Sequence, residues 1–156
     1  MNKKSIVGLI LTLNEELNIK DCISSLNFCN EVIVFDSFSD DQTVLFAKES
    51  GATIKQRIFD NYAAQRNAAL NSIPKEYDWV MMIDADERVT PELQKEILMN
   101  ISKKLNQTTM YRVRRKDQFM NKWIKNSSGY PTWFPRLFKN GKVSVLREIN
   151  EEYKTT

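Results

Sequence analysis

Apolar runs of strand length alternate with stretches of helical periodicity through the first two thirds of the chain. The runs at 5–13 and 78–83 are almost continuously apolar, as central strands of a parallel sheet are. Strands are expected at 5–13, 31–35, 53–58 and 78–83, and helices are expected to begin near Asn14, Asp41, Tyr62 and Thr90. Repeated alternation of strand and helix predicts an α/β fold, a mostly parallel sheet with helices on both faces.

Three of the expected helices carry start signals. Asn14 is interpreted as an N-cap, with Glu15 in the first helical turn. Ser39 and Gln42 have the spacing of a capping box. Thr90 is followed by Pro91, which combines an N-cap with a proline at the first helical position.

The last third of the chain has a different pattern. Residues 110–115 alternate as a strand does, and the polar stretch 116–128 is expected to form a long loop or a short helix. Segments 135–138 and 143–146 flank Asn140-Gly141, a strong turn pair, and are expected to form a hairpin. Because no linker or repeat interrupts the chain, all 156 residues are expected to form a single domain.

The composition excludes several kinds of active site. The chain has no histidine, which rules out Ser-His-Asp and Cys-His catalysis and His-ligated zinc. Its four glycines form neither a dinucleotide fingerprint nor a Walker A loop. A net charge of +3 does not imply nucleic acid as a partner. Cys22 and Cys29 lack metal-site spacing and are expected to be buried thiols of a reducing compartment.

The chain contains no apolar run that approaches the length of a membrane-spanning helix. The apolar stretch 6–13 is short and interrupted, and no cleavage site for a signal peptide follows it. The expected location is therefore the cytoplasm.

Polar residues gather where three of the expected strands end. These clusters lie at 12–15, 36–40 and 84–86. Because ligands bind at the carboxyl ends of parallel strands, the clusters are expected to meet at one site. In extended chain Asp84 and Asp86 would face one side, with Ala85 directed away. Two such carboxylates repel unless a cation joins them, so Mg²⁺ or Mn²⁺ with a diphosphate is predicted; the alternative is an acidic flank of the helix at Thr90.

Two more side chains suit the same chemistry. Asp36 closes the second strand and is predicted to accept hydrogen bonds from a base or from ribose hydroxyls, with a helix N-cap as its alternative role. Arg66 offers a planar donor fork to a phosphate or a paired carboxylate, with a solvated helix position as the alternative. A metal and an arginine on a diphosphate would stabilise the charge on a leaving nucleotide.

Four segments together carry a family resemblance. They are Thr12-Leu13-Asn14-Glu15-Glu16, Asp36-Ser37-Phe38-Ser39-Asp40, Gln65-Arg66-Asn67-Ala68 and Asp84-Ala85-Asp86-Glu87. The chain resembles the family 2 glycosyltransferases of the GT-A fold over nearly its whole length, and most of all the branch that builds lipopolysaccharide cores and capsules. The resemblance implies a GT-A (Rossmann-like) sheet with a small antiparallel C-terminal portion, in which 1–105 binds the nucleotide sugar and 106–156 faces the acceptor.

The resemblance further implies an inverting enzyme that uses Mg²⁺ or Mn²⁺. Such an enzyme moves a sugar from a nucleotide-diphosphate sugar, with a UDP-sugar favoured, to a saccharide or lipid-linked acceptor in cell-envelope polysaccharide synthesis. The residues implied in nucleotide-sugar binding are Thr12, Leu13, Asn14, Glu15, Asp36, Ser37, Arg66, Asp84 and Ala85. Asp86 is implied as the direct metal ligand with Asp84 beside it, and the Gln65-Arg66-Asn67 segment is implied near the diphosphate. Segments 130–133 and 136–138 resemble the acceptor-side part of the family.

Two departures from the family pattern leave the catalytic base open. Thr132 stands where the branch often has an aspartate, and Asn150-Glu151 stands where it often has a His-Glu pair. An inverting transfer needs a base for the acceptor proton. Glu148 and Glu151 are the candidates, followed by Asp117, although the two glutamates also suit solvated terminal charges. Family members commonly continue with helices that complete the acceptor site, so a naturally short protein or a truncated one is expected.

The densest basic run lies beside aromatic residues in the last third. Its members are Arg112, Arg114, Arg115 and Lys116, near Tyr111 and Phe119. We interpret it as one charged strand face; binding of acceptor phosphates and a peripheral contact with the inner face of the membrane are further hypotheses. Trp123, Trp133 and Phe134 suit a sugar-stacking surface, a membrane contact or a core.

Two other functions stay open at this stage. A sugar nucleotidyltransferase has a related sheet, but it normally carries a glycine-rich basic loop where this chain has residues 13–16. A nucleotide-sugar-binding remnant without turnover is favoured by the short C-terminal part and the missing histidine.

Overall fold

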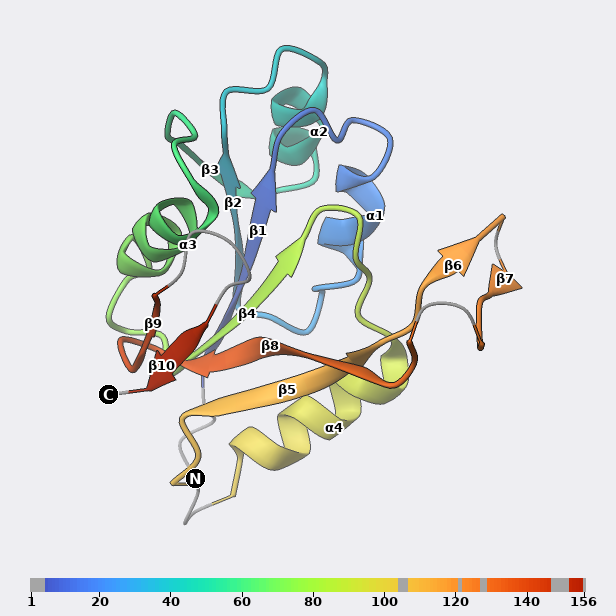
Figure 1. Ribbon diagram of the computed structural model, residues 1–156. Helices are drawn as coiled ribbons and strands as arrows, with labels where there is room; N and C mark the ends of the chain where they lie inside the picture. Colours follow the sequence, from blue (N-terminus) through green and yellow to red (C-terminus); the bar gives the residue numbers. More distant parts are fainter. Residues whose placement is uncertain (1–4, 104–106, 121, 127–128, 147–151, 156) are drawn as a thin grey trace.

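The computed structural model describes residues 5–103, 107–120, 122–126, 129–146 and 152–155. In chain order the elements are β1 (Ile6–Thr12), α1 (Ile19–Ser24), β2 (Glu31–Asp36), α2 (Thr43–Glu49), β3 (Thr53–Gln56), α3 (Tyr62–Asn71), β4 (Trp79–Asp84), α4 (Pro91–Ile101), β5 (Met110–Arg115), β6 (Gln118–Phe119), β7 (Lys122–Trp123), β8 (Thr132–Lys139), β9 (Val143–Val145) and β10 (Tyr153–Thr155). One sheet has the strand order β3-β2-β1-β4-β8-β5 (Figure 1). Its first four strands are parallel, while β8 runs antiparallel to both β4 and β5. The expected mostly parallel α/β sheet is confirmed.

Alternate residues of the central strands pack into two apolar cores, one on each face of the sheet. Ile6 and Ile10 of β1 pack with residues of α1, α2 and α4 on one face. Val7 and Leu9 pack with residues of α3 and with the β9–β10 pair on the other. Because both faces of β1 and β4 are covered, nearly every position in them is apolar, which is the pattern that the sequence displays.

Two of the three predicted helix starts are wrong. Thr90 does cap α4, where its side chain accepts a hydrogen bond from the N–H of Leu93. Asn14, in contrast, has φ 55° and lies well before α1. Ser39 does not cap α2 either, because its N–H and hydroxyl both donate to Asp36. Asn14 is held by hydrogen bonds to the loop after β2, and Ser39 by hydrogen bonds to the end of β2, so these contacts outweigh the capping preference.

The C-terminal part also differs from its sequence pattern. The strand at 110–115 is confirmed as β5, but 135–138 and 143–146 do not pair with each other. Instead β8 pairs with β4 and β5, while β9 pairs with β10. The stretch 116–128, expected as a loop or short helix, contains the antiparallel pair β6–β7. The chain does turn at Asn140-Gly141, where the N–H of Lys142 donates to Lys139 O at 3.1 Å, but the flanking strands pair with other strands instead of with each other.

Two findings concern the environment of the chain. No helix in the described ranges has the length and apolar character needed to cross a membrane. Cys22 and Cys29 are both free thiols; Cys22 is buried and Cys29 is half-buried. Burial raises the pKa of each thiol to about 12, so neither is a ready nucleophile at neutral pH.

Gly8 in β1 provides a test of how tightly the segment that follows α1 packs on the sheet. A Cβ at this position would lie 2.8 Å from Cδ1 of Leu26, whose side chain is fully buried. We expect Gly8→Ala to lower the free energy of unfolding by about 1–2 kcal/mol through overpacking, measured by urea denaturation. Adding Leu26→Val should recover part of this loss because it removes the clashing methyl group. An unchanged stability of Gly8→Ala would contradict the tight packing.

Candidate functional site

The carboxyl ends of β1, β2 and β4 meet at one edge of the sheet. Thr12 of β1 is in register with Asp36 of β2, and Leu11 is in register with Asp84 of β4. Three polar clusters that are distant in sequence thus lie on neighbouring strands. This edge is the place where parallel α/β sheets bind ligands.

Hydrogen bonds join the loop after β1 to the loop after β2. The N–H of Asn14 donates to Ser39 Oγ at 2.9 Å, and the N–H of Asp40 donates to Asn14 Oδ1 at 3.0 Å. The N–H of Glu15 donates to Thr43 Oγ1 at 2.7 Å. These bonds explain the positive φ of Asn14 and fix the two loops relative to each other. Leu13 lies in the loop after β1, next to Asn14, and its side chain is exposed.

Asp36 is fully buried, and its carboxylate is satisfied by the protein itself. It accepts hydrogen bonds from the N–H and hydroxyl of Ser39 and from Gln56 Nε2. Thr12 Oγ1, on the adjacent strand, is buried and has no hydrogen-bond partner in the part of the chain that the structure describes. A buried hydroxyl without a partner is costly, so this atom is suited to a bond with a ligand.

The three side chains of the Gln65-Arg66-Asn67 segment in α3 contact three different parts of the structure. Gln65 Nε2 donates to Ser37 Oγ at 2.9 Å, which links α3 to the end of β2. Asn67 forms two hydrogen bonds with the backbone of Val145 in β9, each 2.8 Å. Only Arg66 reaches the Asp84 segment. Gln65 and Asn67 thus join α3 to the end of β2 and to β9 by hydrogen bonds, contacts that the sequence does not reveal.

Two arginines and two acids form a compact ion-pair network at the end of β4. Arg66 Nη2 lies 3.0 Å from Asp84 Oδ1, and Arg136 Nη2 lies 2.8 Å from Asp84 Oδ2 and 2.7 Å from Glu87 Oε1. The Arg136 side chain is only 6% exposed. Burial lowers the pKa of its guanidinium, but the carboxylates of Glu87 and Asp84 outweigh burial and raise that pKa above its ordinary value.

Sequence reasoning misses this position of Arg136. The resemblance places the Arg136-Leu137-Phe138 segment on the acceptor side, whereas the side chain of Arg136 lies against Asp84 and Glu87. One signal is present in the sequence. Arg136 is a lone charge in an otherwise apolar run, and a buried charge requires a partner.

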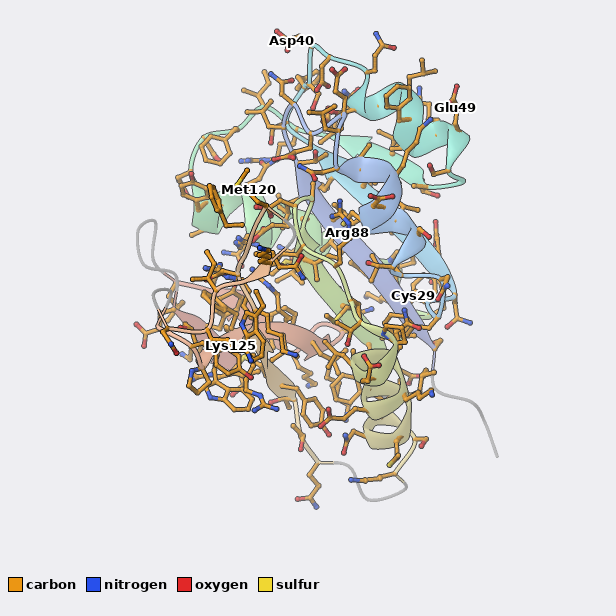
Figure 2. The ribbon with its side chains drawn as sticks, turned by 90° about the vertical axis from the view of Figure 1, so that its right-hand side faces the viewer. Cys29, Asp40, Glu49, Arg88, Met120 and Lys125 are labelled. Carbon is orange, nitrogen blue, oxygen red and sulfur yellow. The ribbon has the colours of Figure 1, made fainter. Side chains whose placement is uncertain are left out.

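The segment after β4 turns at once. The N–H of Glu87 donates to Asp84 O at 2.9 Å, and Arg88 Nη1 donates to Ala85 O at 2.9 Å (Figure 2). Ala85 is buried and Asp86 is exposed. Because the chain is no longer extended here, the expectation that Asp84 and Asp86 face one side by strand alternation has no structural basis.

The residues present fit a divalent cation that is shared with a ligand. Both oxygens of Asp84 accept hydrogen bonds from arginines, whereas Asp86 has no partner within the described ranges. No group of three metal-binding acids, cysteines or histidines occurs among the described residues. Mg²⁺ and Mn²⁺ sites commonly use one or two carboxylates and complete their shell with phosphate oxygens and water. Asp86 meets that requirement, while each oxygen of Asp84 accepts one arginine hydrogen bond and keeps a lone pair for a cation.

Comparison with known proteins supplies the family. The sequence model of Glycosyl transferase family 2 matches residues 9–153, nearly the whole chain. The chain belongs to this family. The expected GT-A class, with a mostly parallel sheet and small antiparallel sheets near the C-terminus, is confirmed with it.

Several relatives of this family 2 chain are longer proteins. An uncharacterized glycosyltransferase of Rickettsia bellii is 42% identical over 95 residues, which are 60% of this chain and 32% of that protein. The lipopolysaccharide core biosynthesis glycosyltransferase LpsC of Rhizobium meliloti is 31% identical over 119 residues, 73% of this chain and 43% of LpsC. The chain thus spans less than half the length of these relatives.

A solved structure is also similar to this family 2 chain. It is glucosyl-3-phosphoglycerate synthase from Mycobacterium tuberculosis in complex with Mn²⁺, UDP and glucosyl-3-phosphoglycerate. The TM-score is 0.46 at 27% sequence identity, over 53% of this chain and 33% of that one.

The candidate bases of this family 2 chain fall in different places. Glu148 and Glu151 lie outside the described residues. Asp117 lies inside them, and its Oδ1 accepts a hydrogen bond from Arg115 Nε at 2.7 Å. Thr132 donates its hydroxyl to Gly129 O at 2.9 Å. Neither Asp117 nor Thr132 lies in the ion-pair network around Asp84.

Proposed function

We propose that this protein transfers a sugar from a nucleotide-diphosphate sugar, with a UDP-sugar favoured, to a saccharide or lipid-linked acceptor of the cell envelope. The observation that carries the proposal is the exposed Asp86, which has no partner among the described residues, beside the charge-balanced network of Arg66, Asp84, Arg136 and Glu87. Family membership supports transfer chemistry. The name of LpsC supports a lipopolysaccharide acceptor.

The donor would lie along the carboxyl edge of the sheet. Its nucleoside would contact the loops after β1 and β2, through Thr12, Leu13, Asn14, Glu15, Asp36 and Ser37. The buried Thr12 hydroxyl, which lacks a partner among the described residues, supports this orientation. Because the Asp36 carboxylate is already satisfied by Ser39 and Gln56, its role would be to shape the loop rather than to form many bonds to the ligand.

The diphosphate would lie near Arg66, Ala85 and Asp86. Asp84 holds Arg66 by an ion pair, so the guanidinium is oriented before a ligand arrives. Asp86 would hold Mg²⁺ or Mn²⁺, with Asp84 beside it. When bound, the metal neutralises charge on the leaving diphosphate. Arg66 would add a second positive charge to the same group.

The acceptor would approach from the 106–156 half, while 1–105 would hold the donor. Glu148 and Glu151 are proposed as the residues that take the acceptor proton. A cytoplasmic protein at the inner face of the membrane would meet a lipid-linked acceptor there. This location follows from the proposed acceptor and is independent of donor binding.

Calorimetry with UDP tests the donor site directly. We expect UDP to bind with Mn²⁺ or Mg²⁺ and to bind much more weakly with EDTA; GDP and CDP serve as matched controls for the base. A ligand at 100 times its dissociation constant should stabilise the fold by roughly 2.7 kcal/mol, which a thermal shift detects. Absence of nucleotide binding with metal present would contradict the proposal.

Hydrolysis of the donor separates transfer from simple binding. Incubation of UDP-sugars with the protein and Mn²⁺ should release UDP slowly even without an acceptor. Binding without any release of UDP would instead support a nucleotide-sugar-binding protein without turnover. UDP-glucose and UDP-galactose, compared at equal concentration, would show whether the sugar is selected.

A further inference from the structure

The β6–β7 hairpin carries two large apolar side chains away from the core. It projects from the body of the molecule beyond the end of β5 (Figure 1). Phe119 is 67% exposed and Met120, at the tip, is 82% exposed. Figure 2 shows Met120 on the face turned to the viewer, with Lys125 on the same face. No packing within the described residues accounts for such a tip, since large apolar side chains at an exposed turn contribute nothing to the core.

Basic residues are frequent on the hairpin and in the segments that flank it. The exposed basic residues on or next to the hairpin are Arg114, Arg115, Lys116, Lys122 and Lys125. Asp117 is the one acid among residues 112–120 and 122–126, and it is paired with Arg115. The local charge is therefore strongly positive, although the whole chain carries only +3.

The aromatic rings nearby are already covered by these cations. Lys116 Nζ lies 4.7 Å and Lys125 Nζ lies 5.1 Å from the centre of the Trp123 ring. The guanidinium of Arg114 lies 5.4 Å from the centre of the Trp133 ring. Single-stranded nucleic acid needs open aromatic faces on which its bases can stack. The arrangement thus disfavours nucleic acid and leaves an exposed apolar tip on a hairpin that is rich in basic residues.

We propose that the β6–β7 hairpin, with Phe119 and Met120 at its tip, docks onto the surface of an anionic lipid bilayer. The two apolar side chains enter the boundary between headgroups and acyl chains, while the surrounding lysines and arginines contact lipid phosphates. Long basic side chains bury their stems and keep their charges at the phosphate level. Tryptophan also favours this boundary, and Trp123 and Trp133 lie at the base of the hairpin.

The hairpin is thus the surface that would make the membrane contact proposed above. Only the reason for such a contact, access to a lipid-linked acceptor, rests on the proposed function. The hairpin and the Asp86 site use different residues. Vesicle binding needs no nucleotide, and UDP binding needs no vesicle. Failure of one therefore leaves the other intact.

Co-sedimentation with vesicles tests the docking surface. The protein should sediment with phosphatidylglycerol–phosphatidylcholine vesicles, but not with phosphatidylcholine alone, and salt should weaken the binding. Lys122→Glu/Lys125→Glu should reduce affinity by at least about tenfold, given roughly fivefold for each cation near an anionic surface. Phe119→Ser/Met120→Ser should also reduce it while leaving the salt dependence. Leu45→Ser/Lys48→Glu makes the same kinds of change at exposed positions of α2, away from the hairpin, and should bind as the parent does.

Tryptophan emission gives a second readout. Trp79 is buried in the sheet, so a blue shift on adding anionic vesicles would come from Trp123 and Trp133. Circular dichroism and UDP binding confirm that each variant is folded. No sedimentation of the parent, equal sedimentation of all variants, or binding of a single-stranded oligonucleotide in place of vesicles would each overturn the proposal.

Discussion

Replacing Arg136 with methionine is expected to lower the free energy of unfolding by about 2–3 kcal/mol. Loss of one partner of a buried ion pair typically costs about 3–5 kcal/mol. A smaller loss is expected here because the Asp84 side chain is 34% exposed, so water can solvate its charge in part. Methionine fills much of the volume of arginine, so the loss reflects the carboxylates of Asp84 and Glu87 left without their cation. Urea denaturation at neutral pH measures the change.

Arg112→Met is the matched control for this substitution. Arg112 is exposed on β5, the strand next to β8, and its replacement should change stability by less than about 0.5 kcal/mol. Adding Glu87→Gln to Arg136→Met should cost less than the two single changes together, since it removes an uncompensated charge. Equal costs for Arg112→Met and Arg136→Met would show that the network does not hold the site.

Asp86→Asn should weaken metal-dependent binding of UDP by more than about tenfold. Mutation of a residue that only hydrogen-bonds to a metal ligand already lowers metal affinity by about that factor. Asparagine keeps the size of the side chain but removes the charge that a divalent cation requires. The weak UDP binding expected with EDTA should not change. Because Asp86 is exposed and has no partner within the described ranges, the melting temperature without ligand should stay close to that of the parent. Calorimetry with and without Mn²⁺ measures the difference.

Two neighbouring acids serve as controls for Asp86. Asp40→Asn alters an exposed carboxylate of the loop after β2, at the same edge, and should leave the effect of Mn²⁺ intact. Asp84→Asn should lower stability as well as affinity, since Asp84 is the shared partner of Arg66 and Arg136. If Asp86→Asn retains the full effect of Mn²⁺ while Asp84→Asn loses it, the direct ligand is Asp84.

Strands buried on both faces are predictable from the sequence. Residues 78–83 and 5–13 are almost continuously apolar because α1, α2 and α4 cover one face of β1 and β4, and α3 with β9–β10 covers the other. The convergence of Thr12, Asp36 and Asp84 follows from the same reasoning, since parallel neighbours end at one edge. The order of residues along the chain is therefore enough to locate polar chemistry at a strand end.

Features that depend on distant partners are not predictable in this way. Asn14 and Ser39 are residue types that favour helix caps, yet each bonds a residue of another loop or strand end. Asn140-Gly141 predicts the centre of a hairpin, but the backbone of β8 finds partners in β4 and β5. The position of Arg136 is hidden for the same reason, because nothing near it in sequence indicates Asp84.

The position of β8 beside β4 ties the two halves of the sequence together. Trp79, Val80 and Met81 have β1 on one side and β8 on the other, and β8 comes from residues 132–139. A fragment that stopped near residue 105 would present this apolar strand as an open edge, through which sheets of separate molecules join. Residues 1–105, expressed alone, would then self-associate, so the half proposed to bind the donor depends for its solubility on a strand from the other half of the sequence.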